Sequence, residues 1–145
     1  MKLYFSAIAG MLLLQSCSDN DIVTGKDLMP EMLQIDSVQI IYFKSPDEPR
    51  YFTYTSTNDA VFIRALINDV TAETQAENPC KKEGKIYCYR KGEVFNTIFF
   101  AYVDRECTFL RYIKNGNLYY FKMSDLLKKT LANYKSTAIE PKASE

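Results

Sequence analysis

Cysteine is the residue type here whose chemistry the sequence defines best, because the chain contains no histidine. Without histidine there is no Ser-His-Asp or Cys-His arrangement, and no Gly-x-Ser-x-Gly, Gly-x-x-x-x-Gly-Lys or His-Glu-x-x-His string occurs. The cysteines are Cys17, Cys80, Cys88 and Cys107, and none of them forms the Cys-x-x-Cys pair typical of zinc sites. We therefore expect covalent or structural roles for the cysteines, with no metal and no other cofactor.

The first sixteen residues have the features of an export signal. Lys2 supplies a positive charge, and the apolar run 3–14 is too short to span a bilayer as a stable helix. The run ends in Leu14-Gln15-Ser16-Cys17, which resembles the lipobox of bacterial lipoproteins. The resemblance implies cleavage of residues 1–16 and attachment of diacylglycerol, with palmitate-type chains, to the Cys17 thiol. The alternatives are an ordinary secretory peptide with a cysteine nearby and a buried N-terminal helix.

The residues after Cys17 refine the expected location. The tract Ser18-Asp19-Asn20-Asp21 is short, polar and acidic. It resembles the tract that routes lipoproteins to the outer membrane in some Gram-negative lineages, whereas in others an aspartate next to the cysteine retains them at the inner membrane. We expect a protein that is lipid-anchored to the bacterial outer membrane, either periplasmic or surface-exposed.

The mature chain is expected to be one small domain. Residues 17–145 number 129, which suits a single domain with its own core. Loss of Lys2 leaves 17 basic and 18 acidic residues, so no basic excess remains for nucleic acid to select. We predict a lipid-anchored tether over 17–34, one α+β domain over 35–135 and a flexible tail over 136–145.

The centre of this domain is expected between residues 85 and 123, where four short strands form an antiparallel meander. Asn115-Gly116 is the dipeptide that a type I′ turn prefers, and Lys91-Gly92 suits the same turn less well. The turns predict the cross-strand pairs Ile113–Leu118, Tyr112–Tyr119, Leu110–Phe121, Arg90–Glu93, Tyr89–Val94 and Cys88–Phe95. Between the middle strands we expect a three-residue loop with Val103 opposite Cys107, because it alone gathers five apolar residues on one core face. These residues are Ile98, Phe100, Leu110, Phe121 and Met123.

The opposite face of the meander is mixed in character. It is predicted to carry Ile86, Cys88, Arg90, Phe95, Thr97, Phe99, Phe109, Arg111, Tyr120 and Lys122. One interpretation is that long side chains such as Arg111 and Lys122 lie over their aromatic neighbours and shield them. The other is a surface for a protein partner, because Tyr, Phe and Arg are the residues that anchor interfaces. The residues of that surface would be Phe95, Phe99, Phe109 and Tyr120 as apolar anchors and Arg111 as the directional contact.

Strand geometry selects one disulfide. Cys88 and Cys107 lie at opposite ends of the strand they share, roughly eight residues of about 3.3 Å apart, or ~26 Å, far beyond the ~7 Å limit on Cα separation in a disulfide. Cys80 enters the first meander strand at the same end of the sheet as Cys107. In an oxidising compartment we therefore predict a Cys80–Cys107 disulfide and a free Cys88 thiol on the mixed face.

Two further strands and two helices complete the expected fold. Residues 35–44 and 51–55 are predicted to form a hairpin, Thr57 or Asn58 to cap a first helix, and Ser124 to cap a second. The first helix has an apolar stripe of Phe62, Ile63, Leu66, Ile67 and Val70. The second has a shared face of Leu127, Leu131 and Tyr134. The prediction is an α+β fold of order ββαββββα, with both helices on one face of an antiparallel sheet.

These features favour a non-catalytic, membrane-anchored envelope lipoprotein that acts as a protein-binding or accessory module through the helix-free sheet face. The alternative is a structural subunit of an envelope complex, with the same face permanently buried against another protein. A stable, monodisperse domain would favour reversible binding, and aggregation without a partner would favour the subunit. A third hypothesis is an enzyme with Cys88 as nucleophile, which requires a thiol pKa lowered by a group such as Arg90 or Arg111.

Overall fold

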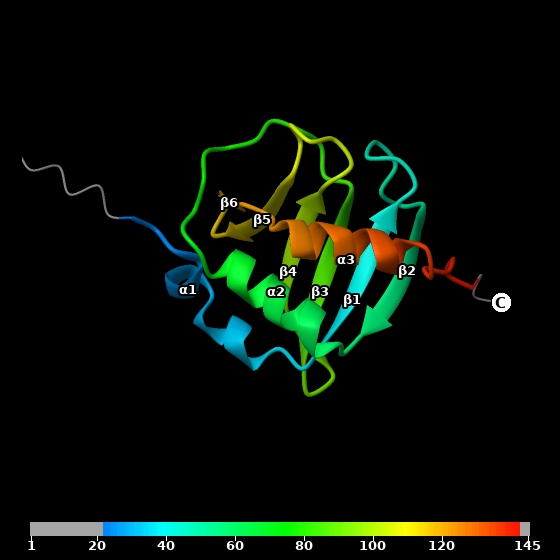
Figure 1. The fold of residues 1–145 in the computed structure, drawn as a ribbon, viewed down its shortest axis with the longest axis horizontal. Coiled ribbons are helices and arrows are strands. Elements are labelled where there is room, and N and C mark those ends of the chain that lie inside the picture. Colours follow the sequence, from blue (N-terminus) through cyan, green and yellow to red (C-terminus); the bar gives the residue numbers. More distant parts are fainter. Residues whose placement is uncertain (1–21, 143–145) are drawn as a thin grey trace, which may run out of the picture.

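Six strands form one antiparallel sheet in the computed structural model, which describes residues 22–142 (Figure 1). The expected signal peptide and the lipid site at Cys17 lie outside the described residues. The strands are β1 (Ser37–Phe43), β2 (Phe52–Thr57), β3 (Gly84–Arg90), β4 (Glu93–Ala101), β5 (Phe109–Lys114) and β6 (Asn117–Phe121). The helices are α1 (Gly25–Leu28), the 3-10 helix η1 (Pro30–Gln34), α2 (Ala60–Val70) and α3 (Asp125–Lys135).

The element order from β1 onward confirms the predicted α+β fold, ββαββββα. The strands follow the spatial order β2-β1-β3-β4-β5-β6, so β3 to β6 form the predicted meander and β1 with β2 forms the predicted hairpin. The hairpin joins the meander through β1, which pairs with β3 and leaves β2 at the edge. Helices α2 and α3 lie across the same face of the sheet (Figure 1). We call the opposite surface the helix-free face.

Two tight turns fix the register of the meander. Lys91 and Gly92 have φ angles of 51° and 79°, and Asn115 and Gly116 have φ angles of 52° and 79°. A positive φ at both central residues is the requirement of the type I′ turn, whose twist matches that of the flanking strands. As a result, all the pairs predicted from these two turns are present except Cys88–Phe95.

The exception is a β-bulge in β4. Tyr89 pairs with Val94 as predicted, but Cys88 pairs with Asn96 and leaves Phe95 as the extra residue. From Cys88 back to Gly84, each residue of β3 therefore faces the side of the sheet opposite to the predicted one.

The bulge corrects the predicted faces of β3. Ile86 and Cys88, expected on the mixed face, are fully buried in the core between the sheet and the helices. Their neighbours Lys85 and Tyr87 lie on the helix-free face, whereas the predicted alternation of β3 would have turned them toward the core.

The connection between β4 and β5 has the predicted register and a longer loop. Ala101 pairs with Phe109, which is the alignment implied by the expected pair Val103–Cys107. The ladder stops at Ala101 because the Glu83 carboxylate accepts hydrogen bonds at 2.8 and 3.1 Å from the next two backbone N–H groups. Val103 and Cys107 therefore lie in the loop and form no strand pair.

The core lies between the sheet and helices α2 and α3. All five residues predicted for the core face of the meander are buried. In the α2 stripe, Phe62, Leu66 and Val70 are buried, while the other two members are half-buried. Leu127 and Leu131 of α3 are buried beside them, which confirms the predicted faces of both helices.

Side-chain caps begin both helices. Ser124 caps α3 as predicted, because its hydroxyl accepts a hydrogen bond of 3.2 Å from an N–H of the first turn. Helix α2 is capped by Asp59 rather than by Thr57 or Asn58, since the Asp59 carboxylate accepts two first-turn N–H groups at 3.1 and 3.4 Å. The Thr57 hydroxyl instead accepts the N–H of Asp59 at 3.0 Å. Each such cap stabilises a helix by about 1 kcal/mol.

The segment before β1 is packed and is not a free tether. Met29, which caps η1, and Met32, which lies within it, are fully buried in the core. The N–H of Gly25 donates a 2.8 Å hydrogen bond to the carbonyl of Ala72. The expected tether 17–34 therefore includes ten residues, 25–34, that belong to the folded domain.

The segment after α3 is also held in place. Tyr54 of β2 and Ile139 exchange two backbone hydrogen bonds, of 2.8 and 2.9 Å. Lys44 forms an ion pair with Glu140. Within the tail predicted over 136–145, Ile139 therefore pairs with the edge strand of the sheet and Glu140 is held beside it.

The predicted disulfide is present between Cys80 and Cys107, with their Cα atoms 5.5 Å apart. It joins the loop 71–83 to the β4–β5 loop across a sequence separation of 27 residues. A cross-link of this span stabilises the fold by about 3–4 kcal/mol in the chain-entropy account. Cys88 is free, as predicted.

Replacement of Gly25 by alanine tests whether residues 25–34 belong to the folded domain. An added Cβ would lie 1.6 Å from the Val70 carbonyl oxygen and 2.9 Å from the Phe121 ring. We expect Gly25→Ala to lower the free energy of unfolding by about 1–3 kcal/mol in urea denaturation, because the backbone must move apart. Lys26→Ala, at an exposed neighbour, is the control, and equal stability of the two variants would contradict this packing.

Candidate functional site

Two of the five residues predicted to contact a partner are covered. Phe109 is 0% exposed and Tyr120 is 3% exposed, and their rings pack edge to face with centroids 5.4 Å apart. Cys80 packs against this pair, and the N–H of Gln75 donates a 2.8 Å hydrogen bond to the Tyr120 carbonyl. The disulfide-bonded loop 71–83 therefore closes this half of the helix-free face, which corrects the prediction for both rings.

The other three residues lie apart from this covered pair. Phe95, at the bulge, is half-buried against the main core and lies under the Arg90 guanidinium, 5.4 Å away. Phe99 and Arg111 are directly opposite each other on β4 and β5, and the guanidinium carbon is 5.4 Å from the ring centroid. Of the predicted surface, Phe99 and Arg111 therefore remain together, outside the pair of rings that the loop buries.

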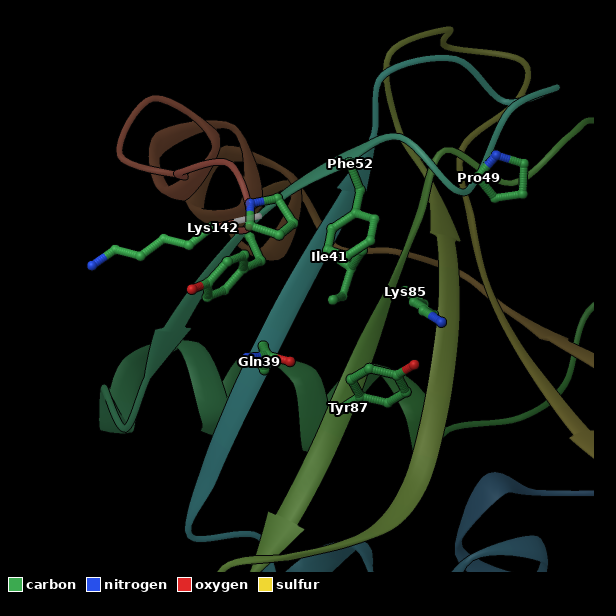
Figure 2. Close-up of a pocket in the computed structure, with 9 residues that line it drawn as sticks. Gln39, Ile41, Pro49, Phe52, Lys85, Tyr87 and Lys142 are labelled. Carbon is green, nitrogen blue, oxygen red and sulfur yellow. The ribbon is translucent and has the colours of Figure 1, made fainter. Parts of the chain in front are cut away.

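A concave region lies on the same face at the other end of the sheet, over β1, β2 and β3 (Figure 2). Its volume is about 600 Å³. We call it the hollow. It is lined by Gln39, Ile41, Pro49, Phe52, Tyr54, Lys85, Tyr87, Pro141 and Lys142.

Alternation along three strands positions the floor of the hollow. Ile41 of β1 lies directly between Tyr54 of β2 and Lys85 of β3, and Gln39 is opposite Tyr87. Successive residues of a strand point to opposite faces, so the residues between these in β1 point into the core. The floor is therefore built from two cross-strand rows and is apolar at its centre, where Ile41 is only 5% exposed.

Two segments outside these strands form the walls. Pro49 belongs to the β1–β2 connection, and Pro141 and Lys142 belong to the segment after α3 (Figure 2 labels Pro49 and Lys142). This second wall is held by the backbone pair between Tyr54 and Ile139. The segment predicted to be a flexible tail thus contributes directly to the candidate site.

The lining of the hollow is aromatic and cationic. Phe52, Tyr54 and Tyr87 supply rings, Lys85 and Lys142 supply ammonium groups, and none of the nine lining residues is a carboxylic acid, an alcohol of Ser or Thr, or a thiol. The Lys85 ammonium lies 4.7 Å from the centroid of the Tyr87 ring, a cation–π contact (Figure 2). Such a site can stack a ring or apolar group and attract a negative charge, but it offers no evident nucleophile.

The free thiol lies on the other side of the sheet. Cys88 is fully buried among core residues, and burial raises the pKa of its thiol to about 12. Since the thiolate is the reactive form, this thiol is protonated and unreactive near neutral pH. The neighbouring cations do not reverse this effect, because Arg90 lies over Phe95 and Arg111 over Phe99.

The hollow is only partly marked in the amino-acid sequence. In the sequence, Phe52 and Tyr54 alternate with Thr53 and Thr55, which is typical of two side chains on one face of a strand. Three facts were missing: β1 pairs with β3, Lys85 and Tyr87 face outward, and the segment after α3 returns to β2. Each of these depends on contacts between distant parts of the chain.

The chain matches no protein-family model, no curated protein and no solved structure. Within residues 22–142, no helix is both long and apolar enough to cross a membrane. In the same part of the chain, no group of three or more His, Cys, Asp or Glu residues is placed to hold a metal ion.

Thiol labelling tests the state of Cys88. We expect iodoacetamide at about pH 8 to leave Cys88 unmodified in the folded protein and to modify it after denaturation without reduction, because burial keeps the thiol neutral and inaccessible. Peptide mapping by mass spectrometry identifies the labelled residue. Rapid, complete labelling of Cys88 in the native protein would contradict its position in the core and would support the hypothesis that Cys88 is a catalytic nucleophile.

Proposed function

We propose that this protein is a lipid-anchored, non-catalytic binding protein of the bacterial envelope that holds a small ligand in the hollow. The observation that carries the proposal is a concavity of about 600 Å³ lined by three aromatic rings, Ile41 and a few polar groups. Sites for small ligands typically enclose ~300–1,000 Å³ and combine an apolar lining with a few polar groups that orient the ligand.

A small ligand is favoured over the protein partner expected from sequence. The covered rings Phe109 and Tyr120 were to be central anchors of that partner surface, and buried anchors contribute nothing to recognition. The hollow is concave and walled on two sides by Pro49 and Pro141. This shape encloses a compact molecule better than it fits a flat protein surface.

The non-catalytic part of the proposal is supported by the chemistry of the available groups. The lining contributes rings, one amide and two ammonium groups, and the buried Cys88 thiol is on the opposite side of the sheet. Reaction at the hollow would require a positioned nucleophile or an acid–base pair. The lining instead matches the requirements of reversible binding.

Membrane anchoring rests on the resemblance of Leu14-Gln15-Ser16-Cys17 to a lipobox. The packed domain begins near Thr24, which caps α1 and is seven residues from Cys17. Seven residues span at most ~25 Å when fully extended. A lipid on Cys17 would therefore hold the domain close to the membrane surface, where a ligand would be captured or handed on.

Tyr87→Ser tests the hollow. The probe is naphthalenemethanol, an uncharged two-ring molecule, titrated by calorimetry into the mature protein in uncharged detergent, with protein-free micelles as the blank. We expect the wild-type protein to bind the probe and Tyr87→Ser to bind it about fivefold more weakly, because one ring contact of ~1 kcal/mol is lost.

The control is Tyr89→Ser. Tyr89 lies two residues further along β3 and is also half-buried, but it does not line the hollow. Thermal unfolding of both variants verifies that they are folded. Absence of binding by the wild-type protein, or an equal loss in both variants, would contradict the proposed site.

Cys17→Ser tests the anchor. We expect the wild-type protein to incorporate radiolabelled palmitate in a bacterial host and to fractionate with the envelope membranes, and Cys17→Ser to lose the label, because no thiol remains to accept the diacylglycerol. Cys88→Ser, which removes a different thiol, is the matched control and should retain the label. Palmitate incorporation that persists in Cys17→Ser would show that the lipobox interpretation is wrong.

A further inference from the structure

Three cations gather around one ring beside the hollow. The Lys82 ammonium lies 4.3 Å from the centroid of the Phe99 ring, and the Arg111 guanidinium carbon lies 5.4 Å from the same centroid. Lys85 is directly opposite Phe99 in the sheet, as Arg111 is on the other side. The row Lys85–Phe99–Arg111 therefore crosses β3, β4 and β5 with Lys82 above its centre.

These cations are not neutralised by carboxylates. In residues 22–142, ion pairs join Lys44, Arg50 and Lys81 to acidic side chains, but none joins Lys82, Lys85 or Arg111 to one. The contrast between Lys81 and its neighbour Lys82 is direct, since Lys81 pairs with Asp47. Three like charges are thus held near one another without an ion pair to any carboxylate of residues 22–142.

The Arg111 side chain also has an unsatisfied donor. Its Nε atom is buried and has no hydrogen-bond acceptor among the described residues. A buried donor without an acceptor costs roughly 1–3 kcal/mol, and more when the group is charged. The fold would recover this cost if an anionic acceptor bound side-on and accepted the Nε–H itself.

The charges are close enough to affect one another. The pKa of Lys82 is lowered, first by burial and then by the charges of Arg111 and Lys85. An anion placed among the three groups would remove this repulsion and gain contacts with all of them. Arg111 suits this role because a guanidinium presents several donors in a plane that matches a carboxylate or phosphate.

The cation cluster is continuous with the hollow. Lys85 belongs to both, and in Figure 2 its side chain is directed away from Ile41, which forms the floor. Neighbouring strands are about 4.8 Å apart, so Lys85 on β3 and Arg111 on β5 are separated by only ~10 Å at their backbones. A single small molecule can therefore place its body in the hollow and one charged end among these cations.

We propose that the ligand is a small organic oxyanion whose ring or apolar body occupies the hollow and whose carboxylate, sulfate or phosphate group is bound by Lys82, Lys85 and Arg111. This inference rests on the proposed function, because it assigns the ligand class of the same site. It also assigns a role to Phe99, whose ring holds two of the cations in position from below. The neutral lining would then supply most of the binding affinity for the body of the ligand, and the cations would select ligands that carry a negative charge.

The experiment compares probes that share one body. Naphthoate, naphthalene sulfonate, naphthyl phosphate and uncharged naphthalenemethanol are titrated into the mature protein in uncharged detergent by calorimetry. The test variant is the double substitution Lys82→Gln with Arg111→Gln, which removes two charges from residues that do not line the hollow. The control is Lys81→Gln with Arg64→Gln, which removes the same two types of charge at exposed positions.

We expect at least one anionic probe to bind the wild-type protein at least about tenfold more tightly than the uncharged probe. The test variant should lose this preference and bind all probes like the uncharged one, while the control variant retains it. A preference for naphthoate alone assigns a carboxylic acid, and a preference for the sulfonate or phosphate assigns that group instead.

Two results would overturn the inference without affecting the proposed hollow. The first is equal affinity of the wild-type protein for charged and uncharged probes. The second is an anion preference that survives the test variant, which would mean that Lys82 and Arg111 only shield Phe99. Failure of the uncharged probe to bind, by contrast, would count against the hollow itself.

Discussion

The bulge at Phe95 is the constraint on which both faces of the sheet depend. The β4–β5 register places Ile98 and Phe100 in the core. Without an extra residue in β4, β3 would have to present Lys85 to the same core and leave Ile86 in water. A buried, unpaired ammonium group is very costly, whereas a bulge costs one missing ladder pair. The bulge therefore sends Lys85 and Tyr87 to the helix-free face.

Packing around the bulge also explains why the N-terminal segment is folded. Asn96, which replaces Phe95 in the pair with Cys88, is a buried polar residue. Its amide donates a 2.9 Å hydrogen bond to the Glu31 carboxylate and a 3.4 Å contact to the Met32 sulfur. The buried Asn96 amide has these partners only when η1 packs beside it. The bulge that orients β3 therefore also requires residues 30–34 to be folded against the sheet.

The sequence predicted the features that depend on local signals. Asn115-Gly116 defines its own turn and hence its pairs, and Ser124 defines the start of its helix. The Cys80–Cys107 disulfide followed from strand length alone, even though the β3 faces were wrong. The bulge was partly foreseeable, since the predicted register would have buried Lys85.

The candidate site was much less predictable, because it is made by parts of the chain that meet only in three dimensions. Ile139 reaches β2 through one pair with Tyr54, and no periodicity marks residues 136–142. Likewise, the burial of Phe109 depends on a loop that is fixed by the disulfide and by hydrogen bonds from Gln75 and Asn78 to distant backbone carbonyls. Phe99 and Arg111 lie opposite each other because the β4–β5 register is the one that the sequence predicted.

The disulfide links the expected location of the protein to its candidate site. Cys80 is two residues before Lys82, so the bond to Cys107 fixes the loop end from which Lys82 reaches over Phe99. The same bond closes the β5–β6 half of the helix-free face and leaves the half over β1 to β3 open. Disulfides persist in oxidising compartments and are reduced in the cytosol. The disulfide therefore supports both the covered rings and the position of Lys82, and the extracytoplasmic location proposed above is one in which such a bond persists.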